Sequence, residues 1–141
     1  MGCVSMAISF IVLGECAAQG RPRVAVRGKH ATVYDPAKSR DYKQYIRLVA
    51  SQHAPETPLI GPLDVEVKVY KAIPKSFSKK RHREAQDGLI RPITKPDIDN
   101  YAKSVKDALS GVIWRDDSQV TDLRIGKWYS NTPRVEITVR G

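Results

Sequence analysis

Residues 63–70 read LDVEVKVY, and apolar and charged side chains alternate along this stretch without interruption. Successive side chains of a β-strand point to opposite faces of its sheet, so the pattern predicts a strand with one buried and one solvated face. The solvated face is expected to carry Asp64, Glu66 and Lys68. This is the clearest strand in the chain, and the other elements are placed relative to it.

Two segments with helical periodicity flank this strand. Upstream, Asp35 and Pro36 predict a helix that continues to about Ser51, because Asp is a frequent N-cap and Pro fits the first helical position. Downstream, a helix is expected over residues 98–110, ending before Gly111. The apolar stripes expected to face the core are Tyr42, Tyr45, Ile46 and Val49 in the first helix, and Ile98, Ala102, Val105, Leu109 and Val112 in the second.

Further strands are expected towards both ends of the chain. Residues 6–13 form an apolar run that predicts a core strand, and residues 23–27 and 31–34 predict a hairpin. Residues 120–128 and 135–139 predict two strands that pair as a hairpin through a short Asn-Thr-Pro connection. The chain of 141 residues suits a single domain. The predicted fold class is α+β, with a mixed, largely antiparallel sheet packed against two helices.

The charge balance indicates a polyanionic partner. Lys and Arg number 24 against 15 Asp and Glu, which gives a net charge of +9. Much of the excess lies in residues 71–91, which we interpret as a mobile segment or a weak helix that orders on binding; a solvated loop is the alternative. The residues expected to contact DNA are Lys75, Lys79, Lys80, Arg81, Arg83 and Lys106.

The cysteines and the N-terminal segment predict a cytoplasmic protein without a membrane anchor. Cys3 and Cys16 form neither a disulfide framework nor a zinc-binding pattern. The apolar run 6–13 is too short to span a bilayer, and no basic residue precedes it as in a signal peptide. Gly2 does not fit a myristoylation signal, because position 6 is Met6 rather than Ser or Thr.

A set of carboxylates suggests chemistry at the start of the second helix. Pro96 disfavours helix just before Asp97, so Asp97 is expected to precede the helix and Asp99 to lie in its first turn. Lys103 follows one turn later on the same face. A turn containing Asp117 could bring a third carboxylate back to the helix start. Such an oxygen-only site suits Mg²⁺ or Mn²⁺ and hydrolyses phosphodiesters.

Each of these residues also has a simpler structural explanation. Asp97 can serve as an N-cap, and Asp99 can complement the helix dipole. Asp99 and Lys103 can form a surface ion pair worth about 0.3–0.5 kcal/mol. Asp116 and Asp117 can simply form a turn. Spacing alone leaves both interpretations open.

Taken together, these motifs resemble a known family. Residues 97–100 (DIDN), Lys103 and residues 114–120 (WRDDSQV) resemble the RusA family of Holliday-junction resolvases, which are often phage-borne. The GRPR stretch at 20–23 resembles the turn after the first strand of some members. The similarity covers about residues 6–140, and the combined motif is far more specific than any part of it.

The resemblance implies a Mg²⁺-dependent, structure-selective endonuclease in DNA recombination and repair, with Mn²⁺ as a substitute. It implies a homodimer in a bacterial or phage-infected cell that makes paired symmetric nicks in a four-way junction and leaves 5′-phosphate ends. The matching positions are Asp97, Asp99 and Asp117 for the metal and Lys103 for catalysis, with Asp116 and Asn100 in support. The long basic segment 71–91 departs from the family pattern.

Two other classes of function remain open from the sequence. One is a basic nucleic-acid-binding module without cleavage, which would bind a four-way junction but never nick it with Mg²⁺ or Mn²⁺. The other is a small structural protein whose charge is incidental, for which binding would be insensitive to salt. The complete set of acidic residues favours the enzyme.

Overall fold

The computed structural model describes the backbone at residues 7–14, 24–27, 30–33 and 36–141, and side chains at residues 7–14 and 42–141. Gly2, Cys3, Met6, Cys16, residues 20–23 and Asp35, on which some predictions depend, lie outside the described residues. Within the described residues no helix is long and apolar enough to cross a membrane.

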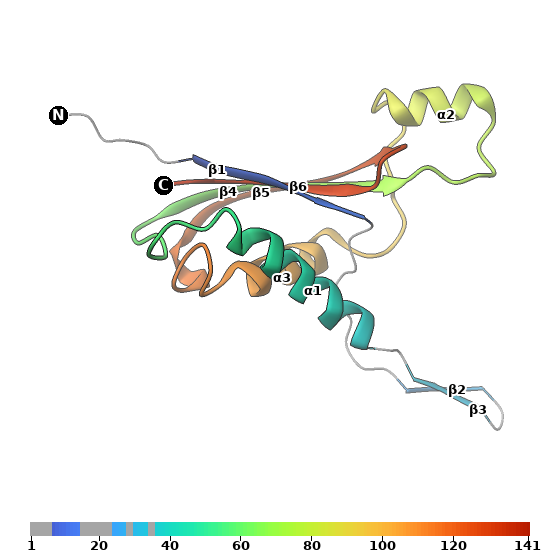
Figure 1. Ribbon diagram of the computed structural model, residues 1–141. Coiled ribbons are helices and arrows are strands. Elements are labelled where there is room, and N and C mark those ends of the chain that lie inside the picture. Colours follow the sequence, from blue (N-terminus) through green and yellow to red (C-terminus); the bar gives the residue numbers. More distant parts are fainter. Residues whose placement is uncertain (1–6, 15–23, 28–29, 34–35) are drawn as a thin grey trace.

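One four-stranded sheet organises the molecule (Figure 1). Its strand order is β1-β6-β4-β5, and β4 pairs antiparallel with β6 and parallel with β5. The sheet is therefore mixed, as predicted. Its strands are β1 (Ala7–Leu13), β4 (Leu63–Ala72), β5 (Val120–Ser130) and β6 (Arg134–Arg140). The predicted hairpin near residue 28 is confirmed as the separate antiparallel pair β2 (Val24–Arg27) and β3 (His30–Val33).

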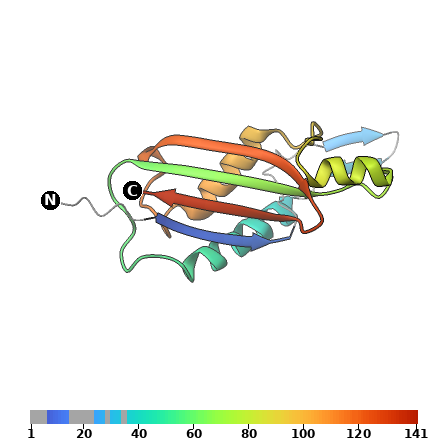
Figure 2. The ribbon, with the colours of Figure 1, turned by 90° about the horizontal axis from the view of Figure 1, so that it is seen from above.

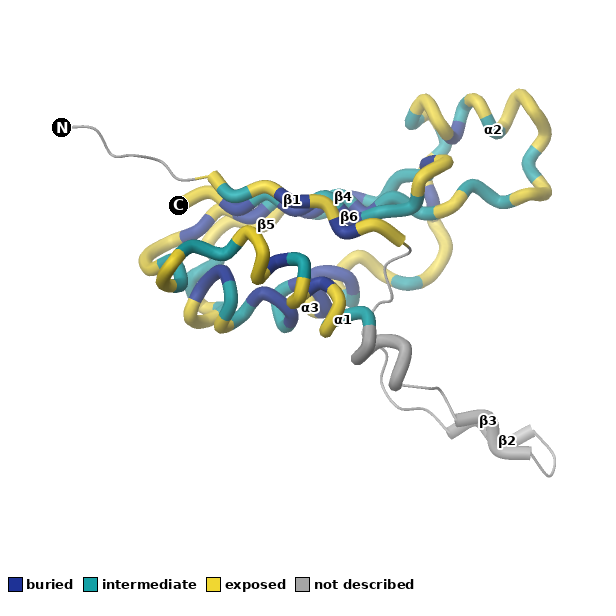
Figure 3. The backbone as a smooth tube through the Cα atoms, in the orientation of Figure 1, coloured by how far each residue is buried: buried dark blue, intermediate teal, exposed yellow. Residues whose placement is uncertain are grey.

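Helices α1 (Pro36–Ser51) and α3 (Ile98–Leu109) cover one face of the sheet, as predicted (Figure 1, Figure 2). A third helix, α2 (Lys79–Gln86), lies on the opposite side near the end of the sheet. It forms within the basic segment that we interpreted as mobile or weakly helical. The Ser78 hydroxyl caps it by accepting a hydrogen bond from the Arg81 amide at 3.2 Å. Among its residues only Ala85 is buried, so no apolar stripe marked this helix in the sequence (Figure 3).

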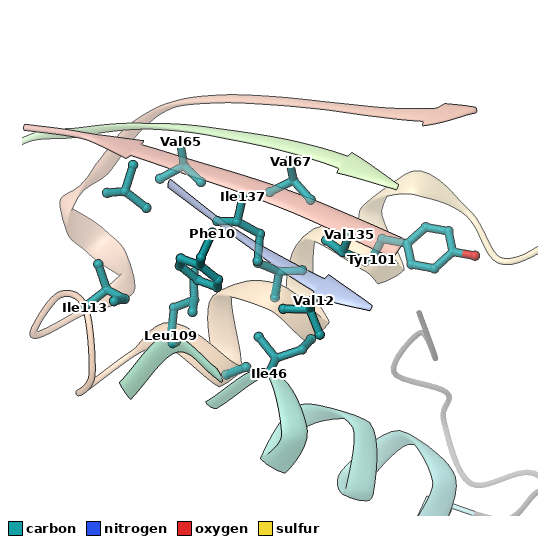
Figure 4. Packing of buried hydrophobic residues seen from close by; sticks show 14 of the residues in the cluster. Phe10, Val12, Ile46, Val65, Val67, Tyr101, Leu109, Ile113, Val135 and Ile137 are labelled. Carbon is teal, nitrogen blue, oxygen red and sulfur yellow. The ribbon is translucent and has the colours of Figure 1, made fainter. Parts of the chain in front are cut away.

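The hydrophobic core lies between the sheet and helices α1 and α3 (Figure 4). The alternation that predicted β4 is confirmed, because its alternate apolar residues are buried and the intervening polar ones are not. The buried side chains contributed by the sheet and both helices include Phe10, Val12, Ile46, Val65, Val67, Tyr101, Val105, Leu109 and Ile137. This packing places α3 along the sheet.

The predicted hairpin between the last two strands is wrong. β5 and β6 are not neighbours, because β4 lies between them and pairs with both. Strands separated by one intervening strand lie about 10 Å apart, and a three-residue connection can span that distance. Residues 131–133 are therefore long enough to cross over β4.

Three further predictions of burial need correction. Tyr45, predicted to face the core from the first helix, is 42% exposed. β1 is an edge strand rather than a fully buried one: Ile11 and Leu13 are 52% and 58% exposed. Its continuous apolar sequence concealed an alternation in which only Phe10 and Val12 are buried. Ile98 is 40% exposed, because the buried face of α3 is turned towards Tyr101.

The side chain of Trp128 in β5 contacts both the sheet and the segment that follows α2. Its indole stacks on Tyr70 with ring centroids 5.8 Å apart, and the Arg91 guanidinium lies 4.1 Å from the indole centroid. Gly88, just after α2, also faces the indole. A β-carbon on Gly126 would overlap the indole ring, so glycine at this position makes room for Trp128.

We expect Gly126→Ala to lower the free energy of unfolding by about 1–3 kcal/mol, because the added methyl group forces the indole out of its place. Urea unfolding measures this loss. In a Trp128→Ala background the overlap no longer exists, so the same substitution should cost little. An equal cost in both backgrounds would show that the indole is not the reason for glycine at 126.

Candidate active site

Two exposed carboxylates stand at the start of α3. Asp97 is the N-cap residue with extended backbone (φ −68°, ψ 155°), and Asp99 lies in the first turn, as predicted. The Asp97 side chain makes no capping hydrogen bond. Helix capping therefore does not account for this carboxylate, and both acidic groups remain available to a ligand.

The remaining predicted residues of α3 lie along its outer side. Lys103 is exposed and Lys106 is half-buried. Within the described residues no ion pair within 4.0 Å joins Lys103 to Asp99, so the surface ion pair considered above is not formed. The backbone amide of Asn100 donates to the Asp97 carbonyl at 3.1 Å, which helps to close the first turn.

Two lysines from the sheet fix the chain just before α3. The Lys71 ammonium, near the end of β4, donates to the Lys95 carbonyl at 3.0 Å and to the Thr94 hydroxyl at 3.3 Å. The Lys127 ammonium, in β5, donates to the carbonyls of Thr94 at 3.0 Å and Pro96 at 3.1 Å. The start of α3 is thus held beside the ends of β4 and β5.

Sequence reasoning did not single out these lysines, although a signal for Lys127 was present. Leu123, Ile125 and Lys127 occupy alternate positions of β5 that pair with buried valines of β4. Lys127 occupies the next position on this core-facing side of β5, where an apolar residue is expected. Such a residue needs a buried or half-buried polar partner, and here the partners are backbone carbonyls.

The third predicted carboxylate, Asp117, lies in a short 3₁₀ turn, Asp117–Gln119, just before β5. Its Oδ1 accepts a hydrogen bond from the indole N–H of the buried Trp114 at 2.9 Å. The neighbouring Asp116 carboxylate accepts from the hydroxyl and the amide of Ser118, and these hydrogen bonds hold the pKa of Asp116 below its usual value. Asp116 is exposed and serves the turn, whereas the half-buried Asp117 carboxylate is held in place by the Trp114 indole.

Gln119 ties this turn to the segment that precedes β4. Its Oε1 accepts from the amides of Arg115 and Asp116, both at 2.9 Å. Its Nε2 donates to the carbonyls of Leu59 at 2.9 Å and Gly61 at 3.1 Å. One side chain thereby satisfies four backbone groups and sets where the Asp116–Asp117 turn lies.

We expect Gln119→Ala to destabilise the protein by about 2–4 kcal/mol, because four backbone groups are left without their hydrogen-bond partner. Urea unfolding measures the effect, and the same substitution at the exposed Gln44 of α1 is the control. A destabilisation no larger than that of the control would mean that the Gln119 side chain does not hold the turn.

The two acidic groups lie at opposite ends of α3. The helix has 12 residues and is therefore about 18 Å long. Asp97 and Asp99 stand at its start, next to the ends of β4 and β5. Asp117 follows its end, in a turn that Gln119 joins to Leu59 and Gly61 before β4. Among the residues described, no three Asp, Glu, His or Cys side chains come close enough to hold a metal ion.

The expectation that the turn returns Asp117 to the helix start is therefore wrong within one chain. The reason is that helix α3 lies between the Asp97–Asp99 pair and Asp117 and keeps them apart. The spacing of these residues in the sequence did not show this separation. The carboxylates of Asp97, Asp99 and Asp117 therefore do not form a three-ligand cation site within one chain. The roles of Asp97, Asp99 and Asp117 as metal ligands, and of Lys103 in catalysis, stay predictions.

The predicted DNA-contacting residues divide between two surfaces. Those on and before α2 are all exposed on one side of the sheet, whereas Lys106 lies on α3 on the other side (Figure 1). A hollow on the α2 side is lined by Phe77, Lys79, His82 and Arg83. The Arg81 guanidinium stacks 4.1 Å from the Phe77 ring centroid. The α2 side is thus a basic surface with an aromatic component.

Comparison with known proteins places these motifs in a family. Residues 14–140 match the family described as endodeoxyribonuclease RusA. The chain is also 56% identical over 135 residues to the uncharacterized protein YqaN of Bacillus subtilis (strain 168), covering 94% of this chain and 95% of that protein. The motifs at 97–103 and 114–120 fall inside the matched region. The chain therefore belongs to the RusA family of endodeoxyribonucleases.

Proposed function

We propose that this protein is a Mg²⁺-dependent, structure-selective endonuclease that resolves four-way DNA junctions in recombination and repair. It acts by paired symmetric nicks that leave 5′-phosphate ends, and Mn²⁺ substitutes for Mg²⁺. The observation that supports this most directly is the exposed carboxylate pair Asp97 and Asp99 at the start of α3, in a chain of a nuclease family.

The separation of the acidic groups favours a homodimer. A two-fold axis across the middle of α3 and β5 would place the start of each element beside the end of its partner. Asp97 and Asp99 of one chain would then lie near Asp117 of the partner subunit. β5 is an edge strand of the sheet, so one of its sides is available for such an approach. This arrangement produces two equivalent sites, as paired nicks require.

The residues of this chain have distinct parts in the proposed reaction. Asp97 and Asp99 supply hard oxygen ligands at a helix N-terminus whose partial positive charge offsets part of their mutual repulsion. Lys103, one turn along, offers an ammonium group to the charge that develops on the scissile phosphate. When bound, Mg²⁺ supplies Lewis-acid stabilisation of that phosphate. The lysine-anchored segment 94–96 keeps the carboxylate pair in place.

Mixed dimers test the composite site. Asp99→Asn and Asp117→Asn should each bind a four-way junction yet fail to nick it with Mg²⁺. When the two variants are mixed and allowed to exchange subunits, each heterodimer regains one intact site. Nicking of labelled junctions should therefore return to about a quarter of the wild-type number of sites, as single rather than paired cuts.

The matched control carries both substitutions in one chain. A heterodimer of wild type with the Asp99→Asn/Asp117→Asn variant has no intact site if each site is shared, but one if each chain holds its own. Activity of this heterodimer, purified away from the wild-type homodimer, together with silence of the single-variant mixture would rule out the shared site. Wild type that binds junctions and never nicks them with Mg²⁺ or Mn²⁺ would favour the binding module instead.

The basic arm, residues 75–83, can be tested by salt dependence. Replacing Lys79, Lys80 and Arg81 by Ala should weaken junction binding and reduce the slope of log K against log salt, by about 0.9 for each phosphate that the arm no longer neutralises. A control with equal change in charge replaces Arg47, Lys68 and Arg140 by Ala, which lie outside the arm and the proposed dimer contact. Arg140 already faces Asp64 at 3.9 Å. Equal slopes for the two triple variants would show that net charge, not the arm, determines binding.

A further inference from the structure

An isoleucine near the candidate site projects almost entirely into solvent. The Ile93 side chain is 96% exposed, more than any other large apolar side chain in the described residues. Single exposed apolar residues are common on protein surfaces and need no explanation by themselves. Two further features distinguish Ile93: its backbone is fixed by long-range contacts, and charged residues lie on either side of it in the sequence.

The backbone on both sides of Ile93 is fixed by long-range contacts. Before it, the Arg91 guanidinium donates to the Lys127 carbonyl at 2.6 Å and stacks on Trp128, and Pro92 is buried. After it, both the carbonyl and the hydroxyl of Thr94 accept hydrogen bonds from lysines of the sheet. The Ile93 side chain is therefore presented from a preorganised loop, which reduces the entropy cost of its insertion into a partner.

The surroundings of Ile93 indicate what kind of partner it meets. Arg91 and Lys95, on either side, are exposed cations, and Asp97 follows four residues later. An exposed apolar residue flanked in sequence by two exposed cations suits a polyanion that also offers an apolar surface. Nucleic acid meets both conditions, because its phosphates bind cations and its bases accept an apolar wedge.

Branched DNA provides the easiest place for such a wedge. Inserting an apolar side chain between stacked base pairs of a duplex costs a few kcal/mol per step. At the branch point of a four-way junction the continuous stack is already interrupted, so less stacking has to be broken. A wedge beside the cleaving residues would thus favour branched over linear DNA.

We propose that Ile93 inserts between bases at the branch point of the junction and so determines the selectivity for branched DNA. This inference rests on the proposed function and extends it, because it assigns structural selectivity to a residue outside the acidic motif. The insertion unstacks bases that lie next to the scissile phosphates. It requires no metal, so binding and unstacking can be measured without cleavage.

The test measures affinity and base unstacking together. Full-length wild type, Ile93→Ser and Ile93→Leu are titrated in EDTA against a four-way junction carrying 2-aminopurine at the branch point, and against the linear duplex. We expect wild type to raise the fluorescence and Ile93→Leu to do the same. Ile93→Ser should abolish most of the rise and weaken junction affinity about tenfold, with duplex affinity unchanged.

Ile11→Ser is the matched control, since Ile11 is 52% exposed on the edge strand β1. It should behave as wild type. A wild-type protein that binds the junction without a rise in fluorescence, or an Ile93→Ser variant with an unchanged rise, overturns the wedge. So does a change in the sedimentation coefficient of Ile93→Ser, which would identify Ile93 as a contact between copies. Wild type with no preference for the junction would instead remove the proposed function.

Discussion

The straight helix α3 is the constraint on which the structure of the site depends. It is packed along the sheet through Tyr101, Val105 and Leu109, and its surroundings are fastened at both ends, by lysines at its start and by Gln119 beyond its end. The chain therefore cannot bend to bring its acidic groups together. About 18 Å of helix separates them, so in the proposed dimer a second copy, related by a two-fold axis, would complete the set of ligands. The proposed dimer follows from this length.

The start of α3 combines acidic side chains with an unusually positive setting. The helix N-terminus carries partial positive charge, and the ammonium groups of Lys71 and Lys127 lie just behind it, bound to carbonyls of residues 94–96. This setting offsets the repulsion between the two adjacent carboxylates and favours the approach of a phosphate. The same hydrogen bonds fix the loop that carries Ile93. The proposed cation binding, phosphate binding and wedge would thus all depend on one set of contacts.

Local sequence patterns predicted most helices and strands correctly, but they did not predict the strand order or the distance between the acidic residues. The alternation in β4, the extent of α1 and the position of Asp97 ahead of α3 were all evident, because each depends on neighbouring residues. The order of the strands was not, because a three-residue connection permits either pairing or crossing. Helix α2 was missed as a stable element since it buries almost nothing. The motif identified the acidic residues but not the distance between them.

Binding of Mn²⁺ across a dilution series, followed by electron paramagnetic resonance, tests the central claim most directly. If Asp97 and Asp99 share a cation with Asp117 of the partner subunit, tight binding should disappear over the concentration range in which sedimentation shows the dimer to dissociate. Asp117→Asn should weaken binding in the dimer to the level of the isolated chain. Equally tight binding by monomer and dimer, unaffected by Asp117→Asn, would contradict the shared site.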